Sequence, residues 1–272
     1  MPATERPDTL PLLEDVGQAL RGLAGNRPVW AYAALQAVTV GYLVARRPWL
    51  VPELLVIAAG LAAFAFLAWY AGRSPRARPD PLPVRSPRGE LVGVAVAVGG
   101  VLLYLYAGWL GIPWQPLLWA VPAGGVIVVA AALLAGATAR DLLGWTLLSW
   151  LPLLPFLALI AIFKAPILGL AIVPLTIGAL VSGVFQQVLL QVGLEARLEG
   201  ALRRADVAIL LAGLVFGLAH VAMNLEQAGG DWSIALANAL VLQANIGVVC
   251  CLAFTRHRAA LALGFAHALF MA

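Results

Sequence analysis

Two histidines and a group of glutamines are the side chains in this 272-residue sequence best suited to chemistry. His220 and His267 lie within long apolar stretches, and an imidazole can accept or donate a proton near neutral pH. Gln186, Gln187 and Gln191 lie in the apolar segment that precedes His220. A neutral amide can position water or a peptide group through hydrogen bonds, but it cannot serve as a general base. The set predicts a polar site with histidine as its only acid–base group.

A metal site and a disulfide are not expected from these residues. Zinc sites usually take three protein ligands, and the apolar stretches supply two histidines, so we predict no metal and no other cofactor. Cys250 and Cys251 are adjacent in an apolar run, where neighbouring residues rarely reach disulfide geometry. They are predicted to be two small buried hydrophobic residues.

The elements that must hold this site are membrane helices. The chain is 62% hydrophobic and 11% charged, whereas a soluble domain has about 25% charged residues. This composition excludes a soluble enzyme, a fibrous chain and a disordered chain. Its 17 basic residues are scattered rather than gathered into a patch, so nucleic-acid binding is not expected either. The lipid bilayer is the expected surrounding.

Apolar runs long enough to cross a bilayer follow one another along most of the chain. A helix needs about 20 apolar residues for one crossing. We therefore predict an all-α polytopic transmembrane helix bundle of about eight to nine spans. The predicted spans are residues 28–46, 54–72, 91–111, 116–137, 142–163, 166–193, 207–224, 233–254 and 259–272.

The breaks between the apolar runs suggest four parts. Residues 1–27 form a cytoplasmic tail with an interfacial amphipathic helix over 9–24. Residues 28–72 hold two leading spans, and residues 73–90 are a cytoplasmic linker rich in proline and arginine. The remaining residues, 91–272, are predicted to form a seven-span bundle.

The distribution of charge predicts the orientation. With nine crossings, 14 of the 17 basic residues fall on the side of the N-terminal tail, and basic residues favour the cytoplasmic side. We therefore expect a cytoplasmic N-terminus in a plasma (inner) membrane, of a bacterium. The other side receives Arg46, Arg47 and Lys164.

Carboxylates are missing from the middle of every predicted span, so the deep polar groups are amides and histidines. Gln243 and Asn245 lie in the eighth predicted span and are expected to line the same cavity as the histidines. Glu195, Glu199 and Arg203 follow the sixth span at helical spacing and are expected to form surface ion pairs.

Residues 181–272 resemble the CPBP family of intramembrane peptidases, which includes CAAX proteases and bacteriocin-processing (Abi) enzymes. The family carries an EExxxR motif, an FxxxH motif and a terminal HxxxN or HxxxD motif. The sequence FGLAH supplies Phe216 and His220, and the ending GFAHALFMA supplies His267. Gln187 stands 33 residues before His220, beside Gln186, in the place of the family's glutamates. The resemblance implies a peptidase site that also includes Phe216.

The chain departs from the family at the residues that would carry catalysis. Gln186 and Gln187 replace the glutamate pair, Gln191 replaces the arginine, and Met271 takes the place of the terminal asparagine or aspartate. In the mechanism that the resemblance implies, a glutamate deprotonates water while histidines bind the water or the oxyanion. General acid–base catalysis contributes about 10²–10⁴-fold, so this chain is expected to hydrolyse peptides weakly or not at all.

Three functions therefore stand as hypotheses. The first is an impaired or inactive peptidase, a pseudoenzyme that binds a membrane peptide or protein in a polar cavity between helices. The second is an active membrane endopeptidase, a hydrolase with a histidine-centred site. The third is a small-solute transporter. Gln186, Gln187, His220 and His267 are predicted to converge within one cavity.

Overall fold

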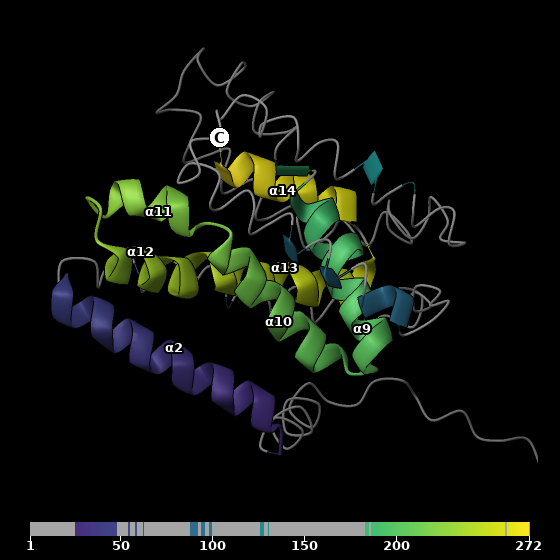
Figure 1. The fold of residues 1–272 in the computed structure, drawn as a ribbon, viewed down its shortest axis with the longest axis horizontal. Coiled ribbons are helices and arrows are strands. Elements are labelled where there is room, and N and C mark those ends of the chain that lie inside the picture. The colour runs from purple at the N-terminus through teal and green to yellow at the C-terminus, as the bar shows by residue number, and fades with distance from the viewer. Residues whose placement is uncertain are drawn as a thin grey trace, which may run out of the picture.

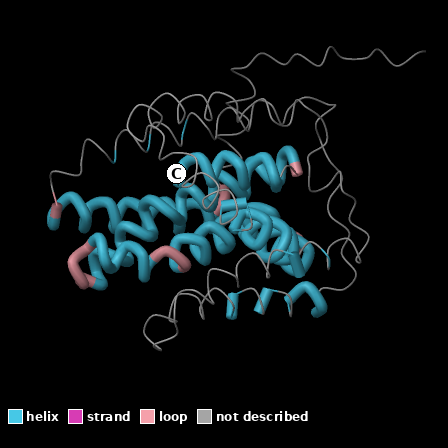
Figure 2. The backbone as a smooth tube through the Cα atoms, turned by 90° about the horizontal axis from the view of Figure 1, so that it is seen from above, coloured by secondary structure: helices cyan, strands magenta, loops and turns pink. Residues whose placement is uncertain are grey.

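The computed structural model describes the first helix and the C-terminal part of the chain. It covers residues 25–47, 186–258 and 260–271, together with positions 54, 58, 62, 88–91, 94, 95, 98, 99, 126, 127, 130, 183 and 184. The predicted interfacial helix over 9–24, and most of the predicted linker and of the spans between 54 and 193, lie outside these residues. The described part is all helical and contains no strand (Figures 1 and 2).

The described helices are α2 and a C-terminal series separated by short breaks. The first, α2, covers Arg27–Arg46, and Asn26 caps its N-terminus by accepting a hydrogen bond from the backbone of Val29. The C-terminal part contains η5 (Leu189–Glu195), α9 (Ala196–Leu202), α10 (Ala205–Leu218), α11 (Val221–Gln227), α12 (Trp232–Asn238), η6 (Ala239–Gln243), α13 (Ala244–His257) and α14 (Ala260–Met271). The segments η5 and η6 are π-helical insertions within longer helices.

Two of these helices are long and apolar enough to cross a membrane. They are α2 and the continuous helix Trp232–Thr255, which contains α12, η6 and most of α13. The α10–α11 pair adds a third if it forms one span, but it is bent by 44° at the break between the two helices. The described part therefore supports a membrane-associated helical protein. It also shows that the predicted seventh span, 207–224, is broken within its length.

The first helix runs parallel to α10 and antiparallel to α12–α13 (Figure 1). At its start, Asn26 donates to the carboxylate of Asp206 at 2.8 Å, beside the first turn of α10. At its far end, the hydroxyl of Tyr42 bonds to that of Ser233, in the first turn of α12. The breaks before α2 and before α10 therefore lie at the same end of the bundle.

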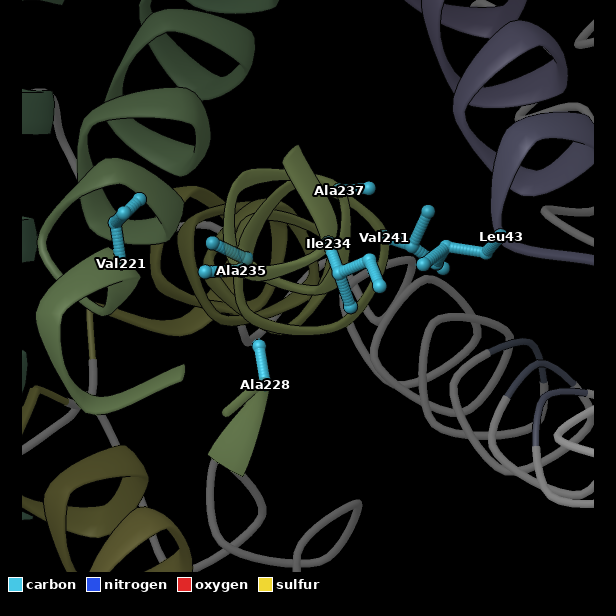
Figure 3. Close-up of a cluster of buried hydrophobic side chains, with 8 residues drawn as sticks. Leu43, Val221, Ala228, Ile234, Ala235, Ala237 and Val241 are labelled. Atoms are coloured by element: carbon cyan, nitrogen blue, oxygen red, sulfur yellow. The ribbon is translucent and has the colours of Figure 1, made fainter. Parts of the chain in front are cut away.

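Apolar packing joins α2 to the C-terminal helices (Figure 3). Leu43 is fully buried and points toward Val241 of η6, and Val221 of α11 faces the same helix near Ala235. A second apolar cluster joins η5 and α9 to α10 and α13. Its buried members are Leu190, Leu194, Leu198, Ala208, Ile209, Ala212, Phe216 and Cys251.

Small residues let α10 and α13 approach closely. A Cβ atom on Gly213 would lie 2.9 Å from the carbonyl oxygen of Ala244, and one on Gly217 would lie 2.8 Å from that of Ala239. Small residues at such contacts are typical of helix packing in membranes. Cys250 and Cys251 are free and buried in this region, as predicted.

Candidate functional site

A stripe of polar side chains runs along the buried face of the helix that contains η5. Gln187, Gln191 and Glu195 follow at intervals of four residues, and none of the three has any exposed surface. In an α-helix of 3.6 residues per turn, residues four apart drift around the axis. The wider turn of a π-helix, which bonds i to i+5, reduces this drift and keeps the stripe on one face. π-helical turns often occur at functional sites.

Gln187 is held at both ends of its amide. Its oxygen accepts a hydrogen bond from Nε2 of Gln191 at 2.9 Å, so its nitrogen is turned toward α14. There Nε2 of Gln187 lies 2.7 Å from Nδ1 of His267. Because an amide nitrogen can only donate, Nδ1 of His267 accepts, and the proton of this neutral imidazole is on Nε2.

His220 carries its proton on the other ring nitrogen. Its Nδ1 lies 2.7 Å from the backbone oxygen of Phe216. A carbonyl oxygen can only accept, so Nδ1 donates and Nε2 keeps a lone pair that can bind a proton. His220 is the residue at the break between α10 and α11, where the helix bends and frees the Phe216 carbonyl from the usual helical bond.

Phe216 links the two histidines. The centroid of its ring lies 4.5 Å from that of His220 and 5.4 Å from that of His267, which it meets edge-on. These distances are typical of packed aromatic pairs. The structure thus connects Gln191, Gln187 and His267 by hydrogen bonds, and Phe216 contacts the rings of His267 and His220. Gln186 lies next to Gln187 and is partly buried.

Two buried atoms at this site have no hydrogen-bond partner within the described part of the chain. One is Nε2 of His267, a donor, and the other is Oε1 of Gln191, an acceptor. Burying polar groups without partners costs about 1–3 kcal/mol each. A peptide group could bind to these two atoms, because its carbonyl needs a donor and its N–H needs an acceptor.

Gln243 is connected to the backbone of His220 through the side chain of Asn224. Its side-chain oxygen accepts a hydrogen bond from Asn224 at 3.1 Å. Asn224, which is 2% exposed, also donates to the backbone oxygen of His220 at 2.9 Å. Gln243 and Asn224 therefore support the bend at His220 from the side of η6.

Asn245 faces the first helix. Its side-chain oxygen accepts from the hydroxyl of Tyr32 at 2.9 Å, and its nitrogen donates to Gln36 at 2.9 Å and to the backbone of Val241 at 2.6 Å. Gln36 also donates to the backbone oxygen of Leu240. These bonds place Asn245 in the contact between α2 and the η6–α13 helix.

Sequence reasoning missed the polar face of α2 and the support from Asn224. Tyr32 and Gln36 are spaced by four residues, so they lie on one face of the first predicted span, and this spacing was the available signal. Asn224 stands at the very end of the predicted seventh span and gives no comparable pattern.

Glu195, Glu199 and Arg203 do not form the expected surface ion pairs. Glu195 is fully buried and accepts a hydrogen bond from the hydroxyl of Thr255. Glu199 pairs with Arg258 at 3.3 Å, whereas Arg203 is exposed at the end of α9. The amphipathic pattern alone predicts a surface-facing stretch, because the helix that contacts this face lies about 60 residues away in the sequence.

Among the described residues, no group of three or more His, Cys, Asp or Glu side chains is placed to hold a metal ion. Met271, at the place of the terminal motif position, is the last residue of α14, and its side chain lies outside the described part. No protein-family model, no curated protein and no solved structure matches the chain.

Proposed function

We propose that this chain is a CPBP-type intramembrane protein with impaired or lost peptidase chemistry, which binds a membrane peptide or protein at the site around Gln187 and His267. The bond from Gln187 to His267 is the observation that carries the proposal. At the position of a family glutamate stands an amide whose oxygen and nitrogen are both engaged. The same bond occupies the basic nitrogen of His267, which leaves this histidine as a donor.

The unpartnered atoms of the site support binding as its role. Nε2 of His267 can donate to a carbonyl, and Oε1 of Gln191 can accept from an N–H group. Both atoms are buried, so the helices around them have to move apart before a segment can bind. Neutral donors and acceptors suit the uncharged backbone of a membrane peptide better than a charged solute.

The proposal includes a bundle of about eight to nine spans in the plasma membrane of a bacterium, with the N-terminus in the cytoplasm. The ends of the described helices support this orientation, since basic residues gather where α2 and α10 begin and where α9 and α13 end. These residues are Arg27, Arg203, Arg204, Arg256 and Arg258. Arg46 and Arg47 lie at the opposite end of α2.

A second candidate is an active endopeptidase with a histidine-centred site. The tautomer of His220 favours it, because the lone pair on Nε2 could take a proton from water. His220 as a residue is partly exposed. In that case the donor on His267 would stabilise the oxyanion.

Binding and cleavage can be measured in one experiment. Full-length protein in lipid nanodiscs is mixed with a panel of single-span peptides, prenylated and unmodified, and the mass of each captured peptide is determined. We expect captured peptides to remain intact. His267→Leu should weaken capture by about 5-fold, which corresponds to one lost hydrogen bond of about 1 kcal/mol.

Asn245→Leu is the matched control, because it removes a polar group of the α2 contact outside the histidine site. It should bind peptides as the wild type does. Equal capture by the wild type and His267→Leu would refute binding at this site. Cleavage that depends on His220 would favour the second candidate.

A further inference from the structure

Glu195 is a carboxyl group buried inside the helix bundle. It is the last residue of η5 and has no exposed surface. Its Oε1 accepts a hydrogen bond from the hydroxyl of Thr255 on α13 at 2.6 Å. Its Oε2 is buried and has no hydrogen-bond partner within the described part of the chain. One oxygen of this carboxyl is thus satisfied and the other is not.

Arg258 is buried beside it with unused donors. It follows the last residue of α13, has a left-handed backbone with φ of 50°, and is 3% exposed. Its Nη2 donates to Oε2 of Glu199 at 3.3 Å. Its Nε and Nη1 are buried without a partner among the described residues.

The balance of charge in this cluster requires a proton. Arg258 and Glu199 form one neutral pair, so an ionised Glu195 would leave one uncompensated negative charge among buried groups. An unpaired buried charge is very costly, and a carboxyl in this position takes up a proton instead. Burial, with a smaller effect of Glu199, raises the pKa of Glu195 to about 8 against the lowering effects of Thr255 and Arg258.

We propose that Glu195 is a proton-binding site and that loss of its proton transfers Arg258 from Glu199 to Glu195. In the protonated state, Thr255 donates to the carboxyl and Arg258 holds Glu199. On deprotonation, the carboxylic O–H bond breaks and the proton passes to water. The free donors of Arg258 then face a carboxylate with an unfilled oxygen, and Glu199, which is partly exposed, can turn to solvent.

The other ionisable groups around Glu195 are buried thiols or are already paired, so Arg258 is the group that can exchange partners. Cys251, on α13, is a free and buried thiol. Arg197, on the same helix as Glu199, is already paired with Glu90 at 3.1 Å. From α10, Asp206 is paired with Arg204.

Arg258 is connected to the histidine site along the chain. Arg258 ends α13, and α14, which begins at Ala260, carries His267. From the other side, Glu195 continues the stripe that contains Gln187 and Gln191. The inference stands independently of the proposed binding function, since it concerns the packing of this helix against α13.

Infrared spectroscopy of the full-length protein tests the proton directly. The carbonyl stretch of a protonated carboxyl group is recorded as the pH is raised. We expect a buried carboxyl signal that disappears with a midpoint near pH 8, is missing in Glu195→Gln and persists in Glu199→Gln. The absence of a protonated carboxyl at neutral pH in the wild type would overturn the proposal.

Double-mutant cycles test the transfer of Arg258. The thermal unfolding midpoint is measured for Glu195→Gln, Glu199→Gln, Arg258→Met and the two double variants with Arg258→Met, at about pH 6 and about pH 9. We expect nonadditive shifts for the 199–258 pair at the lower pH and for the 195–258 pair at the higher pH. Coupling of the 199–258 pair that is unchanged between the two would contradict the transfer.

Discussion

Gln187 and His267, 80 residues apart in the sequence, are joined by a 2.7 Å hydrogen bond between buried side chains. The bond fixes the tautomer of the histidine and connects α14 to the helix that contains η5. It also removes both side chains from base catalysis, because the amide has no basic group and the imidazole nitrogen that could accept a proton is occupied.

The same bond should contribute measurably to stability. Gln187→Leu leaves Nδ1 of His267 and Nε2 of Gln191 without their partner, so we expect a loss of about 1–3 kcal/mol. His267→Leu should cost a similar amount. The double variant removes both ends of the bond and should cost less than the sum, as measured by unfolding in detergent. Strictly additive losses would show that the bond contributes nothing.

The polar contacts of α2 should anchor the first helix. Asn245→Leu removes the partners of Tyr32 and Gln36, and we expect faster proteolysis in the segment that contains α2 and a stability loss of about 1–2 kcal/mol. Val38→Ala, on the exposed face of α2, is the control. Unchanged proteolysis of the Asn245 variant would argue against an anchoring role.

Close packing of α10 against α13 should make substitution of a packed glycine costly, whereas substitution of an unpacked glycine should be tolerated. Gly217→Ala would place its methyl group 2.8 Å from the carbonyl oxygen of Ala239, which is backbone and cannot move aside. We expect a loss of about 1–3 kcal/mol from overpacking. Gly41→Ala on α2 meets nothing within 4 Å and should be tolerated. Comparing the unfolding midpoints of the two variants checks this, and equal midpoints would contradict the packing.

Stability should fall as the pH rises through neutrality. The pKa of Glu195 is raised from 4.5 to about 8, so between these values the folded state holds a proton that the unfolded chain has released. The contribution of Glu195 to the free energy of unfolding is therefore greatest below pH 4.5. It is lost as the pH rises to about 8.

Glu195→Gln should flatten that part of the profile, because a neutral amide replaces the titrating carboxyl. Glu226→Gln, at an exposed position, serves as the control and should keep the wild-type slope. Midpoints from thermal unfolding across this pH range provide the measurement. A profile that rises with pH in the wild type would have the wrong sign.

The sequence was most informative where a pattern repeats along one helix. The apolar runs predicted the boundaries of α2, of the continuous helix Trp232–Thr255 and of α14 closely, because length and hydrophobicity determine these elements. They could not reveal the break at His220, which depends on bonds from its ring and from Asn224 to the backbone. The π-helical turn of η5 gives no periodic signal that distinguishes it from an α-helix either.

The other positions of the site depend on contacts between helices that are far apart in the sequence. The resemblance singled out Gln187 and His267, and the structure places them in contact. Asn245 was expected with the histidines because it lies deep in a predicted span, but a single polar residue does not indicate which neighbouring helix it faces. Glu195 was assigned to the surface for the same reason: its partner Thr255 is 60 residues away.

Turnover of a membrane peptide by two variants of the site tests the central claim most directly. The wild type and Gln187→Glu/Gln191→Arg are compared at equal concentration, with His220→Ala added to each, and the cleaved product is quantified by mass spectrometry. We predict at most a trace of product from the wild type and at least about 10²-fold more from the double variant, since a buried carboxylate restores a general base. Efficient wild-type cleavage that His220→Ala abolishes would contradict the account.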